Sequence, residues 1–152
     1  MPSPAFRPRH ISRQGVVTVY QSFEDTLELF TPEGERGWVP GWEPEYLYRA
    51  GGGDEIDTVF RTIHDGVETL WVVLDHDREE GTAAYSRHAI GLHIGTVTVS
   101  VEEIDRTSCW VEVTYELTSL TPAGNARLAE MTPKKFAGMM EEWGQRIAQR
   151  SS

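Results

Sequence analysis

The stretch that decides the fold is residues 132–149, TPKKFAGMMEEWGQRIAQ. A helix turns by about 100° per residue, and at this spacing the apolar side chains form one narrow stripe while most of the charged and amide side chains point away. The stripe consists of Phe136, Met139, Met140, Trp143 and Ile147. Thr132 can cap the helix start, and Pro133 suits the first helical position, where no backbone N–H is needed. We therefore expect a long helix that needs an apolar wall opposite its stripe.

The residues before this helix are typical of β-strands that can supply the wall. Segments rich in β-branched and aromatic residues alternate with turns of hairpin length, which predicts an antiparallel meander. The expected strands are residues 10–20, 46–49, 57–64, 68–75, 82–90, 94–104 and 110–119. The last of them alternates most cleanly, with one apolar face made by Val111, Val113, Tyr115 and Leu117. A sheet with one apolar and one polar face is covered on one side only.

Two shorter helical segments are also expected. Ser22 and Asp25 have the spacing of a capping box, and apolar residues then recur at helical intervals, so a helix of two turns should follow the first strand. Those apolar residues are Phe23, Leu27 and Phe30. Residues 121–124 predict a turn, and residues 126–131 predict one further helical turn before the final helix.

Residues 31–44, TPEGERGWVPGWEP, are too rich in proline and glycine for regular structure. This segment should therefore be a loop, and it carries Trp38 and Trp42 on either side of a Pro-Gly turn. Large rings in such a loop can close an apolar pocket or plug the open end of a sheet. Glu35 lies beside them and can be a pocket carboxyl group, a member of a surface ion pair or a helix cap.

The length and overall composition limit the number of domains and the kinds of partner that we expect. The 152 residues predict a single domain over residues 1–152, with residues 1–9 as a flexible leader. With 14 basic and 24 acidic residues the net charge is -10, which disfavours nucleic acid and anionic membranes. No stretch is apolar enough to span a membrane, and Cys109 is the only cysteine, so we expect a cytoplasmic protein. An exposed edge strand would make a homodimer plausible.

The order of elements resembles the helix-grip fold of the START-like (SRPBCC) superfamily, which includes the birch-pollen allergen type and bacterial polyketide cyclase/dehydrase-like proteins. Residues 30–44, 69–73 and 114–118 are similar to stretches of uncharacterised bacterial members. The resemblance implies an α+β fold in which a curved antiparallel sheet of six to seven strands wraps a long C-terminal helix, with a short helix after the first strand.

The resemblance further implies a small hydrophobic ligand, lipid-like, aromatic or polyketide-like, in a cavity between the sheet and the C-terminal helix. The candidate ligand-binding residues, each also explicable as core packing, are Trp38, Trp42, Trp71, Tyr85, Tyr115, Phe136, Met139, Met140 and Trp143. A second hypothesis is a cyclase- or dehydratase-like enzyme in the same cavity, with acid–base candidates Glu35, Arg61, Tyr85 and His88. A third is a protein-interaction module with a filled core and an exposed apolar patch.

Metal and cofactor chemistry is not expected. Four histidines, His64, His76, His88 and His93, fall within thirty residues, but none of them has the helical spacing of a zinc protease. There is no Gly-x-Ser-x-Gly motif, and the glycines at 51–53 lack the lysine of a phosphate-binding loop. We therefore predict no metal site and no cofactor.

Overall fold

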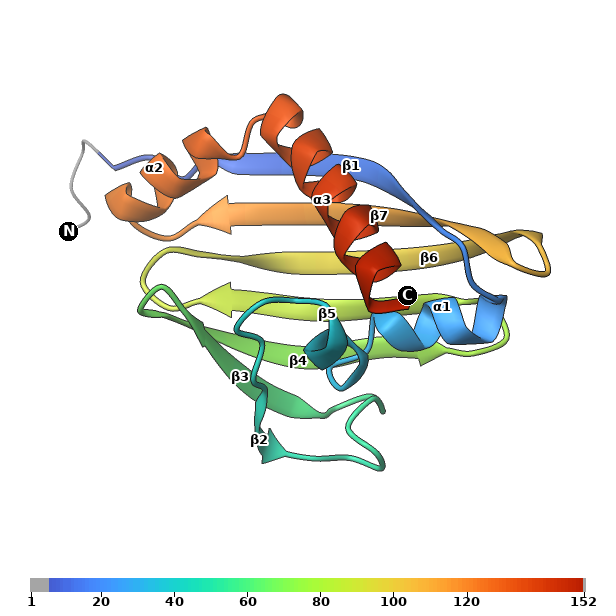
Figure 1. The fold of residues 1–152 in the computed structure, drawn as a ribbon. Coiled ribbons are helices and arrows are strands. Elements are labelled where there is room, and N and C mark those ends of the chain that lie inside the picture. The colour runs from blue at the N-terminus through green and yellow to red at the C-terminus, as the bar shows by residue number, and fades with distance from the viewer. Residues whose placement is uncertain (1–5, 152) are drawn as a thin grey trace.

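The computed structural model describes residues 6–151, which form a seven-stranded antiparallel sheet and helices that cover one of its faces (Figure 1). The strands are β1 (His10–Val19), β2 (Glu45–Tyr48), β3 (Val59–His64), β4 (Val67–Asp77), β5 (Thr82–Ala89), β6 (His93–Asp105) and β7 (Ser108–Ser119). The helices are α1 (Phe23–Leu29), the 3-10 helix η1 (Gly34–Gly37), α2 (Pro122–Glu130) and α3 (Pro133–Ser151). This arrangement confirms the predicted helix-grip α+β fold.

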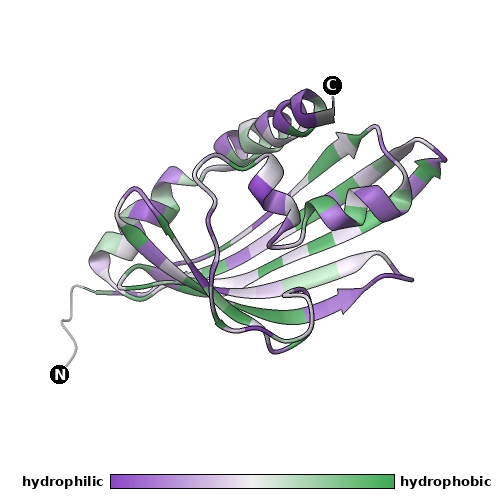
Figure 2. Ribbon diagram, turned by 60° about the horizontal axis from the view of Figure 1, so that its bottom comes forward, coloured by the Kyte–Doolittle hydropathy of each residue, from purple (hydrophilic) through white to green (hydrophobic). Residues whose placement is uncertain are grey.

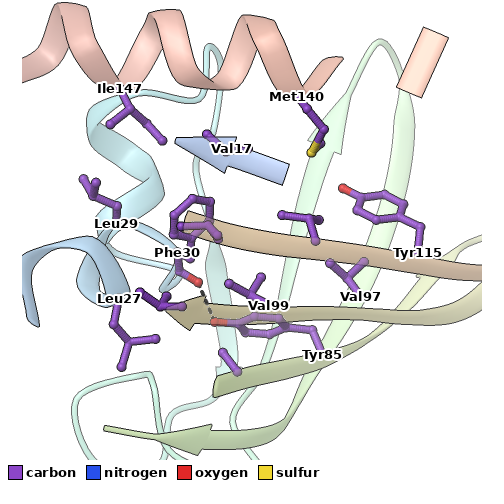
Figure 3. Close-up of a cluster of buried hydrophobic side chains, with 14 of the residues drawn as sticks. Val17, Leu27, Leu29, Phe30, Tyr85, Val97, Val99, Tyr115, Met140 and Ile147 are labelled. Atoms are coloured by element: carbon purple, nitrogen blue, oxygen red, sulfur yellow. Dashed lines mark hydrogen bonds between the residues drawn. The ribbon is translucent and has the colours of Figure 1, made fainter. Parts of the chain in front are cut away.

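The order of strands across the sheet is β1-β7-β6-β5-β4-β3-β2, so the first strand lies beside the last one. Inward and outward side chains alternate along each strand, which appears in Figure 2 as hydropathy that changes from residue to residue. On β7 the four predicted inward residues are buried: Val111, Val113, Tyr115 and Leu117. Figure 3 shows how side chains from β5, β6 and β7 meet those of α1 and α3 in this core.

Helix α3 lies directly on β1. A Cβ atom added to Gly15 would stand 2.6 Å from Met140 Cγ and 3.2 Å from a ring carbon of Phe136, so only glycine lets helix and strand come this close. Phe136, Met140 and Ile147 are buried, whereas Met139 and Trp143 are half-buried. The predicted stripe is thus covered along most of its length.

The capping predictions hold at both helix starts. The Asp25 backbone N–H donates to Ser22 Oγ (3.2 Å), and the Lys135 backbone N–H donates to Thr132 Oγ1 (3.2 Å). The predicted turn at residues 121–124 is wrong, because helix α2 already begins at Pro122. The Thr121 side chain caps it by accepting from the Gly124 N–H (3.0 Å), and proline is well tolerated in a first helical turn.

The predicted flexible leader falls partly outside the described residues, which begin at residue 6. Its last residues are hydrogen-bonded to the rest of the chain. Arg9 exchanges two hydrogen bonds with Ser119, its N–H donating to Ser119 Oγ (2.7 Å) and its carbonyl accepting from the Ser119 N–H (2.8 Å). Asn125 Nδ2 donates to the Arg7 carbonyl (3.0 Å). Within residues 6–151, no helix is both long and apolar enough to cross a bilayer.

Candidate functional site

The space between the sheet and α3 is divided into two compartments. The inner void, of about 30 Å³, holds one or two water molecules at most. The outer pocket, of about 380 Å³, opens between α3, the loop around Trp38–Trp42 and the ends of β3 and β4, and its volume suits a small organic molecule. The two share one wall, made by Glu35, Trp42, Trp71, Tyr115 and Trp143.

Glu35 is held in this wall by a hydrogen-bonded turn. Buried Thr31 donates its hydroxyl to the Glu28 carbonyl (2.8 Å) and accepts from the Gly34 N–H (3.0 Å). The Glu35 N–H donates to the Thr31 carbonyl (3.0 Å), and the Glu35 carbonyl accepts from the Val39 N–H (2.9 Å). The backbone of Glu35 is therefore fixed on both sides, which aims its side chain at both compartments.

Glu35 is half-buried, and its carboxyl group lies in a largely desolvated position in this wall. No hydrogen bond or ion pair joins it to another described residue, and this burial raises its pKa from 4.5 to about 8. Its neighbour Arg36 points elsewhere, to the Glu33 carboxylate (3.0 Å). At neutral pH the Glu35 side chain is mostly a neutral acid that can both donate and accept a hydrogen bond.

Two groups of aromatic rings form the apolar walls. In the first, Trp38 contacts Phe30 and Trp143 edge to face, with ring centroids 5.5 and 5.4 Å apart. In the second, Trp71 stacks on Phe60 (5.8 Å) and meets Trp42 edge to face (5.7 Å). Edge-to-face and stacked contacts are favourable, so each ring of the walls is supported by its neighbours.

Most polar groups of these rings are already hydrogen-bonded within the protein. The indole N–H groups of Trp38, Trp42 and Trp71 donate to the Leu29 carbonyl (2.8 Å), the Pro32 carbonyl (2.8 Å) and Thr62 Oγ1 (3.0 Å). The Tyr85 hydroxyl donates to the Phe30 carbonyl (2.7 Å), the dashed line of Figure 3. These groups shape the pocket but have no donor to offer a ligand.

Tyr115 and Arg87 are different. The Tyr115 hydroxyl makes no hydrogen bond to another described residue, and in Figure 3 it points into the space beneath α3. Arg87 lies near the rings of Trp71 and Tyr115, with its guanidinium carbon 5.6 and 5.4 Å from their centroids. Its Nε and Nη1 atoms are buried without a partner among the described residues. The pocket therefore combines aromatic walls with uncommitted polar groups, which include those of Glu35, Arg87 and Tyr115.

The predicted site residues separate into three groups. Trp38, Trp42, Trp71, Tyr115, Met139, Trp143 and Glu35 line the outer pocket, and Tyr85 lines the inner void. Phe136 and Met140 lie in the core beside β1. Arg61 and His88 line neither compartment. Arg61 pairs with Glu45 (2.9 Å) and Glu68 (3.6 Å) on the outer face, and His88 alternates with inward Arg87 and Ala89 on β5.

Arg87 is the residue that sequence reasoning missed. The pattern Ala83, Tyr85, Arg87, Ala89 places its side chain on the same face of β5 as Tyr85, so the alternation alone pointed inward. An arginine at an inward position of a strand is unusual enough to signal a functional role. No group of three or more His, Cys, Asp or Glu side chains in residues 6–151 is arranged to hold a metal ion.

The similarity of this chain to known proteins is found in its structure. No family model and no curated protein matches the sequence. Among solved structures, norcoclaurine synthase from Thalictrum flavum, in complex with dopamine and hydroxybenzaldehyde, is similar at a TM-score of 0.66 and 15% identity, over 95% of this chain and 90% of that one. A START superfamily protein from Mycobacterium smegmatis reaches 0.67 at 13% identity, over 92% and 97%.

A third similar structure, the Mll3558 protein from Rhizobium loti, has a TM-score of 0.63 at 15% identity and covers 93% of this chain and 99% of its own. All three likenesses extend over nearly the whole chain, while their identities are too low to carry function across. The chain therefore has the helix-grip fold that START-like proteins share.

Proposed function

We propose that this protein binds a small, largely apolar and aromatic molecule in the outer pocket. The observation that carries the proposal is the combination of about 380 Å³ of space, packed aromatic walls and a few polar groups with no partner among the described residues. Desolvation of apolar ligand surface supplies affinity, at roughly 25 cal/mol per Å², and the polar groups orient the ligand. The norcoclaurine synthase structure, whose two bound molecules are aromatic, supports the same ligand class.

The five tryptophans provide the test. Trp38, Trp42, Trp71 and Trp143 line the outer pocket, whereas Trp110 is 52% exposed and alternates with buried Cys109 and Val111 on the other face of the sheet. We expect the neutral aromatic probe N-phenyl-1-naphthylamine to shift the indole N–H NMR signals of the four pocket tryptophans and to leave that of Trp110 unchanged. Shifts at Trp110 alone, or none at saturating probe, would contradict the proposal.

A matched pair of variants tests the pocket independently of the NMR experiment. Met139→Trp places a large ring at the wall of the outer pocket, and Ala137→Trp places the same ring on the exposed side of the same helix. We expect the first variant to weaken probe binding by about tenfold or more and the second to leave it within about twofold. Native mass spectrometry of gently purified protein then identifies any molecule that co-purifies, and its loss from Met139→Trp would tie it to this pocket.

Glu35 favours a second candidate function in the same pocket. An acid with a pKa of about 8 can donate and accept protons near neutral pH, which is the minimum requirement of a cyclase- or dehydratase-like reaction. A molecule found by co-purification is to be incubated with the wild type and with Glu35→Gln. Conversion of the molecule by the wild type alone would support catalysis. If neither protein changes the molecule, the result would support binding without reaction. A protein-interaction module, by contrast, has no need of this pocket.

A further inference from the structure

Beside the outer pocket lies a second hollow with an unusual charge. It has a volume of about 320 Å³ and lies between β5, β6, α2 and α3. Its ionisable residues are Arg87, His93, Arg127, Lys135 and Glu130. Three fixed positive charges and one negative charge are thus gathered in a chain whose net charge is -10. We call this hollow the basic pocket.

Two of its residues have buried nitrogen atoms that no described residue satisfies. They are Nε and Nη1 of Arg87 and Nδ1 of His93. Buried polar atoms are normally hydrogen-bonded, and a charged group without a partner is the costliest exception, so unpaired atoms of this kind point to a partner from outside the protein chain. Arg87 is the more telling case because its guanidinium stays charged.

The local potential is positive as well. The pKa of His93 is lowered from 6.5 to about 4, first by burial and then by the nearby charges of Arg87 and Arg127. His93 is therefore neutral at pH 7 and leaves the positive charge to the arginines and Lys135. A neutral imidazole can still donate one hydrogen bond.

Arg87 and Met139 line both the basic pocket and the outer pocket. The guanidinium therefore stands where the aromatic compartment ends and the positive compartment begins. The guanidinium carbon is 5.6 Å from the Trp71 ring centroid and 5.4 Å from the Tyr115 ring centroid, and contacts with rings leave the N–H groups Nε and Nη1 without an acceptor. A guanidinium edge matches the planar geometry of an oxyanion such as a carboxylate.

We infer that the ligand is an amphipathic acid, with an aromatic or other apolar body in the outer pocket and an oxyanion bound by Arg87 at the edge of the basic pocket. The inference rests on the proposed function, because it names the chemical class of the molecule that occupies the outer pocket. Arg127 and Lys135, both exposed at the rim, add attraction without direct burial. Glu35 faces the other part of the pocket, where a neutral acid pairs with a hydroxyl or carbonyl group of the ligand.

Two probes with nearly the same apolar body test this inference. The first is 8-anilinonaphthalene-1-sulfonate, which carries an oxyanion, and the second is neutral N-phenyl-1-naphthylamine, which lacks it. A purely apolar pocket prefers the neutral probe, because a sulfonate is costly to remove from water. We expect the wild type to bind the sulfonate at least as tightly as the neutral probe, as measured by fluorescence titration and calorimetry.

Substitution of Arg87 tests whether this residue causes the binding of the sulfonate probe. We expect Arg87→Gln to weaken sulfonate binding by about tenfold or more and to leave the neutral probe within about twofold. Arg106→Gln is the matched control, with the same change of charge in the exposed β6–β7 turn, at the opposite end of β6 from His93. Should Arg87→Gln fail to fold, the surface pair Arg127→Gln and Lys135→Gln is expected to weaken the sulfonate alone by about twofold to threefold.

The outcomes separate the two proposals. A wild type that binds the neutral probe but not the sulfonate, or an Arg87→Gln that weakens both equally, overturns the amphipathic-acid inference and leaves the pocket function standing. A wild type that binds neither probe overturns both. Sulfonate binding that disappears in Arg87→Gln and persists in Arg106→Gln supports both.

Discussion

The two compartments under α3 are built from the same kinds of residue but differ in what their polar atoms do. Around the inner void the Tyr85 hydroxyl is used within the protein, on the Phe30 carbonyl, and about 30 Å³ remains. Arg87 on the outer pocket and Tyr115 in the wall shared by both compartments have no such partner, and about 380 Å³ of the outer pocket is open. Buried polar groups are normally satisfied, so the first arrangement stabilises the fold and the second is prepared for a ligand.

Truncating one apolar side chain in each compartment should give the largest difference in stability. Phe60 is 1% exposed and packs on Trp42 and Trp71, whereas Met139 is half-buried at the wall of the outer pocket. We expect Phe60→Ala to lower the free energy of unfolding by about 3–5 kcal/mol and Met139→Ala by about 1 kcal/mol. Urea denaturation measures both. Equal losses would mean that the outer pocket is ordinary core.

The pH dependence of stability tests the carboxyl group between the compartments. The folded pKa of Glu35, about 8, lies above its unfolded value near 4.5, so the folded state keeps a proton that the unfolded state has released. Stability from this group is therefore complete below about pH 4.5 and falls by up to about 1.4 kcal/mol per pH unit until pH 8. We expect Glu35→Gln to remove that slope and to be more stable than the wild type at pH 8 by about 2–4 kcal/mol.

Urea denaturation of the wild type and Glu35→Gln at several values between pH 5 and pH 8.5 measures this difference. Glu33→Gln is the control, because the hydrogen bond from Tyr46 lowers the pKa of Glu33. Its folded pKa is below the unfolded value, so its contribution to stability disappears at acid pH and not between pH 6 and 8. Parallel curves for the wild type and Glu35→Gln would show that the Glu35 carboxyl group is hydrated and titrates normally.

The smallest expected effect comes from removing one hydroxyl oxygen, either beside the inner void at Tyr85 or in the shared wall at Tyr115. Tyr85→Phe leaves the buried Phe30 carbonyl without its donor and should lower the free energy of unfolding by about 1–2 kcal/mol. Tyr115→Phe breaks no hydrogen bond between described residues and should change it by no more than about 0.5 kcal/mol. Thermal and urea unfolding under identical conditions compare the two. A larger loss for Tyr115→Phe would reveal that its hydroxyl supports the fold.

The sequence predicted what depends on local periodicity. The stripe of α3, the alternation of β7 and the Ser22 cap are each determined by residues a few positions apart, and all three hold in the structure. The turn predicted at residues 121–124 is wrong, because Thr121 caps a helix there and Pro122 fits its first turn.

The functional site could be predicted only in part, because it depends on contacts between segments that are distant in the sequence. Glu35 could be named from the loop, but its buried carboxyl group depends on how the Thr31 turn folds against α1. The inward position of Arg87 was readable from the alternation on β5, whereas its lack of a partner depends on β5 lying between β4 and β6 and under α3. How far the rings fill the interior depends on packing between distant segments, and no local pattern encodes this.

The place of β1 in the sheet also governs how the protein is made. Its only strand neighbour among the described residues is β7, and even its nearest partner along the chain, Cys109 opposite Val19, lies about 90 residues further on. On the ribosome, β1 must therefore wait without its partner while five other strands are synthesised. Such late, distant pairing slows folding. Because Tyr115 of β7 and Trp143 of α3 line the outer pocket, that pocket is completed only as the last strand and helix are added.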